Sequence, residues 1–123
     1  MKLVIEIADV PPTINKLSRS WRSAWRKGKE WQQFLVVGTT AKQRRELSEA
    51  KGMRTVSIFC RHMKLWDADN AQSANKVILD AGTRLGFWED DSGKFVMVSP
   101  VKQELAKKRS EIFTRITIKT EDA

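Results

Sequence analysis

The feature that most constrains the fold is the alternation of apolar and polar side chains in residues 54–62. In an extended chain, Val56, Ile58 and Cys60 share one face, and Ser57 and Arg61 lie on the other. A period of two residues is typical of a β-strand with one buried face. The segment therefore predicts a strand in a sheet.

A helix is predicted to follow over residues 70–85. Apolar residues recur there at helical spacing: Ala71, Ala74, Ile78, Ala81 and Leu85. Gly86 suits the position just past the helix end, and Asp69 or Asn70 is expected to cap its start. Asp80 is expected to pair with Arg84, which lies four residues later.

Residues 2–7 alternate weakly and predict a first strand, which the prolines that follow would end. The basic and aromatic residues from 16 onward predict an irregular stretch. A helix is predicted over about residues 29–50, although Gly38, Thr39 and Thr40 are poor helix formers.

Two more strands are predicted, over residues 94–99 and 111–119, with a polar linker between them that could hold a helical turn. The predicted order is strand, helix, strand, helix, strand, strand. This order indicates an α+β fold in which two helices cover a small mixed sheet. A chain of 123 residues fits one such domain, residues 1–123.

Composition narrows the possible partners. A net charge of +8 favours a polyanion, either nucleic acid or an anionic membrane surface. The membrane is the weaker alternative, because the predicted helices lack a long amphipathic face edged by Lys and Arg. Cys60 and His62 are single, which excludes an internal disulfide and a Cys/His zinc set. A reducing, cytoplasmic setting is expected.

Carboxylates gather in residues 64–95 despite the basic composition: Asp67, Asp69, Asp80, Glu89, Asp90 and Asp91. If the chain is extended there, Asp67 and Asp69 project to the same side and repel each other. Mg²⁺ prefers oxygen ligands and would relieve that repulsion. A third carboxylate is expected from residues 89–91, in the same chain or in a second subunit. Alternatively, Asp69 only caps a helix and residues 89–93 only form a charged turn.

The N-terminal third carries a basic and aromatic stretch that could neutralise DNA phosphates. Its cations are Lys16, Arg19, Arg22, Arg26, Lys27 and Lys29. Trp21 and Trp25 interleave with them and could stack on exposed bases or pack in the core or a dimer interface. Trp31, Trp66 and Trp88 are expected to pack, and the basic residues 107–109 are expected to form a solvated loop.

Four motifs taken together carry a resemblance to a known family. They are "PPTIN" at residues 11–15, "DADN" at 67–70, "NKVILDA" at 75–81 and "GFWEDD" at 86–91. In these motifs and in the order of its elements, over its whole length, the chain resembles the RusA family of Holliday-junction resolvases. The resemblance implies Mg²⁺-dependent cleavage of four-way DNA junctions by a homodimer, with Mn²⁺ as a possible substitute.

The resemblance also implies roles for single residues. Asp67, Asp69 and Asp91 would be the essential metal-binding carboxylates, and Asp90 a neighbour that could join them. Lys76 would be the catalytic lysine; Asn15 and Asn70 belong to the motifs without an assigned role. The family places its lysine three residues after the asparagine, where this chain has Ser73. Lys76 matches only if residues 72–74 are an insertion of about one helical turn.

Two hypotheses follow from the sequence. The first is a structure-selective endodeoxyribonuclease that resolves Holliday junctions in recombination and repair. The second is a non-catalytic basic module that binds branched or single-stranded DNA, in which the acidic residues only cap helices and keep the surface soluble. The two hypotheses differ in whether the protein needs a metal to act on DNA.

Overall fold

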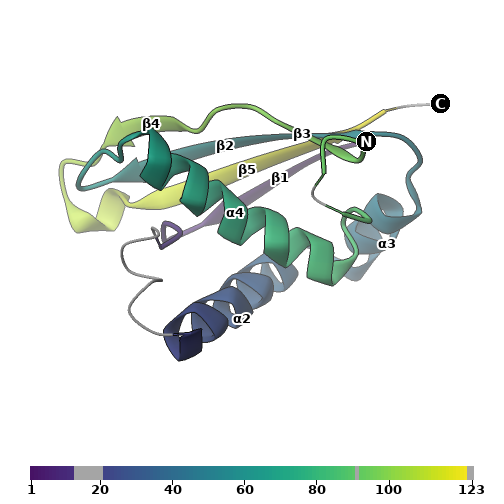
Figure 1. The fold of residues 1–123 in the computed structure, drawn as a ribbon, viewed down its shortest axis with the longest axis horizontal. Helices are drawn as coiled ribbons and strands as arrows, with labels where there is room; N and C mark the ends of the chain where they lie inside the picture. The colour runs from purple at the N-terminus through teal and green to yellow at the C-terminus, as the bar shows by residue number, and fades with distance from the viewer. Residues whose placement is uncertain (13–20, 91, 122–123) are drawn as a thin grey trace.

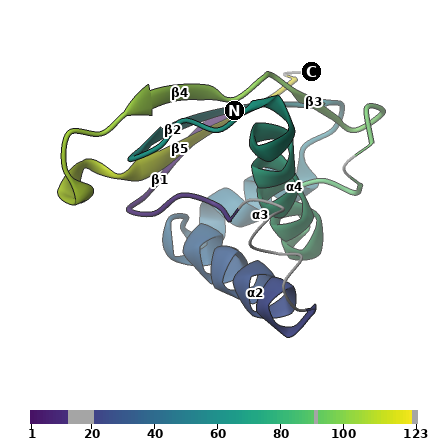
Figure 2. The ribbon, with the colours of Figure 1, turned by 60° about the vertical axis from the view of Figure 1, so that its left-hand side comes forward.

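A computed structural model describes residues 1–12, 21–90 and 92–121, without the side chain of Trp21. The described residues form one five-stranded sheet with α-helices on one side of it (Figures 1 and 2). Its strands are β1 (Lys2–Ile7), β2 (Arg54–His62), β3 (Val96–Val98), β4 (Lys102–Leu105) and β5 (Phe113–Thr120). The order is β1, β5, β2 and then β3, with β4 also paired to β2. Antiparallel and parallel pairs both occur, which confirms the predicted α+β fold and mixed sheet.

Strand β2 lies in the middle of the sheet, and its predicted apolar face is the core face. Val56 pairs with Ile118 and Ile58 pairs with Ile116 on β5, and all four side chains are buried. Ile5 of β1 continues the same apolar row next to Ile116. The helices cover this face (Figure 2). The period of two residues therefore predicted correctly both the strand and the face of it that is buried.

The first helical region differs from the prediction. Helix α2 (Trp21–Val37) begins within the stretch predicted to be irregular, and a separate helix α3 (Ala41–Glu49) follows. The break falls at Gly38–Thr40, where Thr39 donates its hydroxyl to the carbonyl of Leu35 at 2.7 Å. Thr40 then caps α3 in a reciprocal capping box with Gln43. Residues with low helix propensity thus end one helix and start the next.

Helix α4 (Ala68–Leu85) matches the prediction to within two residues, but its cap differs. Asp67, rather than Asp69 or Asn70, is the N-cap, and its Oδ1 accepts the backbone N–H of Asn70 at 2.9 Å. Gly86 ends the helix with a φ of 78°, as predicted for a left-handed C-cap. The expected pair of Asp80 with Arg84 is wrong. Asp80 pairs instead with Lys76, one turn earlier, at 3.3 Å.

The predicted linker between the last two strands contains a strand of its own. Strand β4 pairs in parallel with the second half of β2, with Phe59 opposite Lys102. The 3₁₀ turn at Arg109–Glu111 supplies the expected helical turn. Short polar edge strands carry little local signal, because their pairing partner is distant in sequence.

Arg54 joins three parts of the fold at the start of β2. Its guanidinium is buried, with the residue 7% exposed, and donates only to backbone carbonyls. Nη2 donates to Leu47 and Ala50 at 2.7 and 2.8 Å, at the C-terminal end of α3. Nε donates to Phe87 at 3.1 Å, in the turn after α4. A cation suits the negative end of a helix dipole, so Arg54 fixes α3 and this turn to the sheet.

Replacing Arg54 with lysine is expected to lower the free energy of unfolding by about 2 kcal/mol, although the charge is kept. A lysine ammonium cannot match the forked geometry of the guanidinium, so buried carbonyls lose their donors. Urea denaturation measures the change. Arg45→Lys, at an exposed position of α3, is the control and should be neutral. An unchanged midpoint for Arg54→Lys would contradict this role.

Cys60 is fully buried on the core face of β2. Burial raises the pKa of its thiol from 9.0 to about 11, and a hydrogen bond with Thr114 offsets part of that rise. As the pH rises, the thiol ionises first in the unfolded chain, because its pKa there is the lower one. The free energy of unfolding therefore keeps the full contribution of the neutral thiol below pH 9 and loses it as the pH rises toward about 11.

We therefore expect ionisation of Cys60 to lower the free energy of unfolding by about 2 kcal/mol at about pH 11 relative to neutral pH. The measurement is urea denaturation of the wild type and of Cys60→Ala across this alkaline range. Lysines titrate there too, so the difference between the two proteins isolates the thiol. Parallel pH dependences in the two proteins would show that the thiol ionises equally in the folded and unfolded states.

Candidate functional site

The start of α4 borders a hollow of about 880 Å³ that brings acidic and basic groups together. Asp67 and Asn70 line it from α4 and its cap. Lys27 of α2, Lys64 of the β2–α4 connection and Arg109 of the 3₁₀ turn also line it. The prolines of the "PPTIN" motif, Pro11 and Pro12, complete one side; the rest of that motif lies outside the described residues. Segments far apart in the sequence thus meet at one end of the sheet.

The chain leading to Asp67 is held from β4. The side-chain amide of Gln103 accepts the backbone N–H of Trp66 at 2.8 Å and donates to the carbonyl of Trp66 at 3.2 Å. His62, the last residue of β2, lies 2.9 Å from the same amide oxygen through Nε2 and packs its ring on Trp66. Gln103 therefore fixes the segment that places Asp67 at the start of α4.

The oxygen atoms at this end of α4 suit a hard cation. One oxygen of Asp67 accepts the capping hydrogen bond, and the carboxylate remains exposed. The Oδ1 atom of Asn70 is buried without a hydrogen-bond partner among the described residues. A buried oxygen without a donor is costly, and coordination of a cation would satisfy it. Carboxylate and amide oxygens fit Mg²⁺.

Asp69 lies in the first turn of α4 and faces a different hollow of about 1330 Å³, between α4 and the edge of the sheet. The expectation that Asp67 and Asp69 project together from an extended chain is therefore wrong. Lys76 lines the same hollow as Asp69, two turns along the helix, and forms the ion pair with Asp80. The structure places Lys76 on the face of α4 that carries Asp69.

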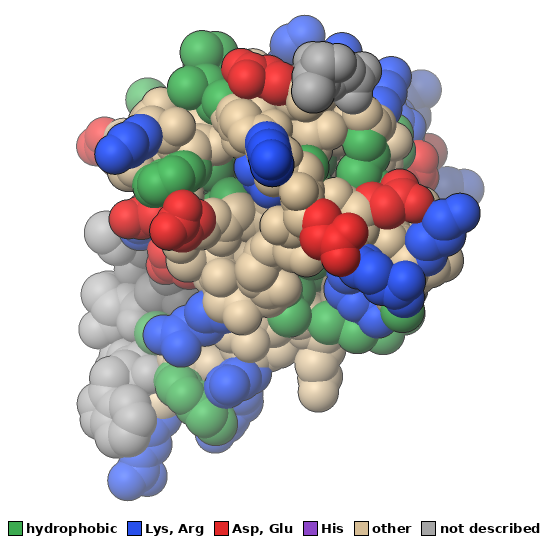
Figure 3. Space-filling model, turned by 90° about the vertical axis from the view of Figure 1, so that its right-hand side faces the viewer, with side chains coloured by type: hydrophobic (Ala, Val, Ile, Leu, Met, Phe, Trp, Pro, Cys, Tyr) green, Lys and Arg blue, Asp and Glu red, His purple; other side chains and the backbone are tan. Residues whose placement is uncertain are grey.

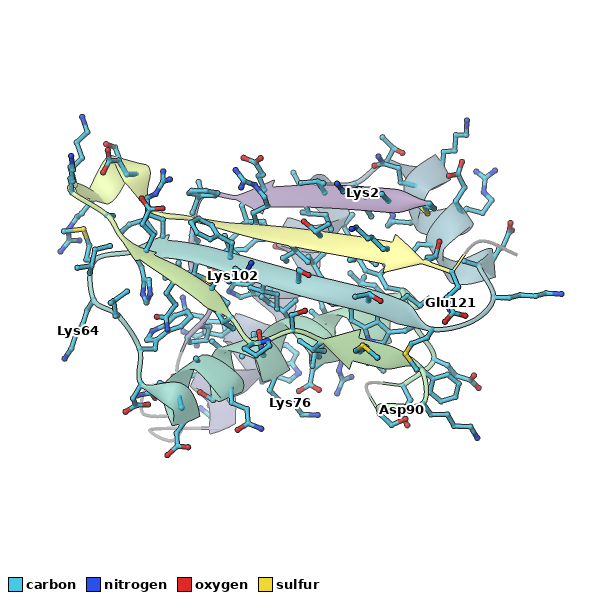
Figure 4. The ribbon with its side chains drawn as sticks, turned by 90° about the horizontal axis from the view of Figure 1, so that it is seen from above. Lys2, Lys64, Lys76, Asp90, Lys102 and Glu121 are labelled. Atoms are coloured by element: carbon cyan, nitrogen blue, oxygen red, sulfur yellow. The ribbon has the colours of Figure 1, made fainter. Side chains whose placement is uncertain are left out.

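The predicted third carboxylate, Asp91, lies outside the described residues. Glu89 and Asp90 are exposed after the turn that ends α4, and Figure 4 shows Asp90 toward the opposite end of the molecule from Lys64. Figure 3 shows that acidic and basic side chains are intermingled on the end that carries α3. Within residues 1–12, 21–90 and 92–121, three or more acidic, histidine or cysteine side chains do not come together as a metal site.

The basic stretch forms the exposed first half of α2. Arg22, Arg26, Lys27 and Lys29 are exposed there. Trp25 is 63% exposed, with the ammonium of Lys29 5.7 Å from its ring centre. Asn15, Lys16 and Arg19 fall outside the described residues, as does the side chain of Trp21. Trp31 and Trp88 are buried and Trp66 packs against the core, which confirms the prediction for these three.

The chain matches no family model and no curated protein. In the described part of the chain, no helix has the length and apolar character needed to span a membrane.

Sequence reasoning missed part of this site. Lys64 was given no role, and Arg109 was expected in a solvated loop. A basic residue next to an acidic motif, Lys64 three residues before Asp67, was the available signal. Arg109 had no such signal, because only the pairing of β4 with β2 brings the 3₁₀ turn to the hollow.

Proposed function

We propose that this protein is a metal-dependent endodeoxyribonuclease that cuts branched DNA, with the four-way junction as its substrate. The observation that supports this most is the hollow at the start of α4. Asp67 and Asn70, which carry oxygen ligands, line it together with three cations, Lys27, Lys64 and Arg109. A phosphodiester needs cations to bind it, and its hydrolysis needs a group that activates water.

In this proposal the residues of the site have different roles. Asp67 would hold Mg²⁺, with the amide of Asn70 beside it in the same hollow. Asp69 faces the other hollow and is not part of this set. A further carboxylate, Asp91, would come from the second subunit, because Asp90 lies toward the opposite end of the molecule from Lys64. When bound, the metal polarises a phosphate oxygen and lowers the pKa of water. Lys64 and Arg109 would orient the DNA phosphate at this hollow. Lys76 lines the other hollow, so in this proposal it would contact the DNA beside the site rather than the reacting phosphate. The exposed cations of α2 extend the contact along the duplex.

A homodimer follows from the substrate. A four-way junction has two-fold symmetry, and two related active sites would cut two strands in equivalent places. The RusA resemblance supports the same arrangement, because resolvases of that family act as dimers.

The test is incubation of the protein with a synthetic four-way junction, in Mg²⁺ or in a chelator. We expect paired, symmetric nicks only with Mg²⁺, and intact junction with the chelator. Linear duplex of the same sequence is the control and should stay uncut. Binding of the junction without cutting in Mg²⁺ or Mn²⁺ would contradict the nuclease assignment.

The second candidate is a DNA-binding module without catalysis. The capping hydrogen bond of Asp67 and the place of Asp69 in the first turn favour it, because both carboxylates stabilise the positive end of the helix dipole. Under this alternative, junction binding has the same salt dependence but no metal dependence. The cleavage experiment therefore separates the two candidates.

A further inference from the structure

The face of the sheet opposite the helices carries a cluster of aromatic and basic side chains. Figure 4 looks down on this face, and the described helices lie behind the sheet. The cluster consists of Phe59 and Arg61 on β2 and Phe113 and Arg115 on β5. Antiparallel pairing places Phe59 opposite Arg115 and Arg61 opposite Phe113. The four side chains thus form a square at the end of β2 that leads to Asp67.

Each arginine lies against the rings. The two ring centres are 5.6 Å apart, and the guanidinium carbon of Arg61 is 4.9 Å from the centre of Phe113. That of Arg115 is 5.3 Å from Phe113 and 5.8 Å from Phe59. Each arginine also forms an ion pair with a carboxylate of a neighbouring strand. Arg61 pairs with Glu104 at 3.5 Å, and Arg115 pairs with Glu6 at 3.4 Å. The cations are therefore positioned beside the aromatic surface before any ligand arrives.

The rest of this face is also basic. The strand register and the alternation of side chains place two carboxylates on this face, Glu6 and Glu104. They also place five basic residues there: Lys2, Arg61, Lys102, Arg115 and Lys119. Half-buried aromatic rings among cations are the chemistry that binds unpaired bases, because every base has a face to stack and every nucleotide has a phosphate. Duplex DNA offers phosphates but keeps its bases stacked inside.

We infer that this square is a binding site for single-stranded nucleic acid, separate from the acidic hollow. Unpaired bases stack on Phe59 and Phe113, and Arg61, Arg115 and Lys102 contact the adjacent phosphates. The inference goes beyond the proposed cleavage and does not require it. At a branched substrate, the site would hold a strand that has left the duplex close to the start of α4.

The test measures binding of a fluorescent thymidine oligomer of about 12 nucleotides, in chelator so that no cutting occurs. We expect the double variant Phe59→Leu, Phe113→Leu to bind it about tenfold more weakly, while affinity for a duplex of equal length is unchanged. Leucine keeps an apolar contact but removes the flat ring. Phe95→Leu, at a half-buried ring that has the ammonium of Lys94 5.9 Å from its centre just before β3, is the matched control and should bind the oligomer like the wild type.

A second variant, at an exposed residue of the same square, tests the site without changing the packing of the sheet. Arg115→Gln, whose side chain is 46% exposed, should weaken binding of the oligomer several-fold and reduce its dependence on salt concentration. The inference is overturned if the wild type does not bind the oligomer at about 50 mM salt. It is also overturned if both variants bind normally. Normal binding together with conversion of a dimer to a monomer would instead make this face a subunit interface.

Discussion

Replacing Asp67 with asparagine is expected to abolish Mg²⁺-dependent cleavage of a four-way junction and to leave the fold unchanged. Asparagine caps a helix as well as aspartate does, so the hydrogen bond to the N–H of Asn70 survives and stability should change by less than about 0.5 kcal/mol. The negative charge that would hold the metal is lost. A metal contributes several kcal/mol to the transition state, so the cleavage rate should fall by about 1000-fold.

The measurement is the single-turnover cleavage rate, together with thermal unfolding and junction binding of the same variant. Glu49→Gln, at the exposed end of α3, makes the same change of charge away from the hollow and should cut normally. Asp67→Ala is the less informative variant, because it also removes the cap at a cost of about 1 kcal/mol. Cleavage by Asp67→Asn at the wild-type rate would mean that Asp67 is only a helix cap.

The elements with strong local periodicity were predictable, and those fixed by distant contacts were not. Strand β2 and helix α4 follow directly from their apolar spacing. The start of α2 did not, since Trp, Ser and Gly in its first turns carry weak helix propensity. Its helical form depends on packing against α4. Strand β4 was missed for the same kind of reason, because its pairing to β2 is not visible in the local sequence.

The candidate site divides in the same way. Asp67 and Asn70 could be found from their motif, yet their geometry could not, because either aspartate of the motif could cap the helix. The meeting of Lys27, Lys64 and Arg109 at one hollow depends on the sheet order and on the approach of α2 to α4. The square around Phe59 and Phe113 similarly requires the antiparallel register of β2 and β5.

The turn after α4, which carries the "GFWEDD" motif, depends on close contact between Trp88 and Gly82. Trp88 is 2% exposed and donates its ring N–H to the hydroxyl of Thr83 at 2.9 Å. A Cβ added to Gly82 would lie 2.1 Å from Cζ2 of that ring, closer than any real contact. Gly28 of α2 offers the opposite case, because a Cβ there would meet nothing within 4 Å.

The two glycines therefore form a matched pair of helical Gly→Ala variants. Gly28→Ala should stabilise the protein by about 0.5–1 kcal/mol, because alanine favours the helix. Gly82→Ala should destabilise it by about 3 kcal/mol, because the displaced ring loses part of a tryptophan's burial, which is worth about 3–5 kcal/mol. Urea denaturation followed by circular dichroism measures both changes. If Gly82→Ala stabilises as Gly28→Ala does, Trp88 does not pack on α4 as described, and the turn that carries Glu89 and Asp90 would depend on Phe87 and its hydrogen bond from Arg54 instead.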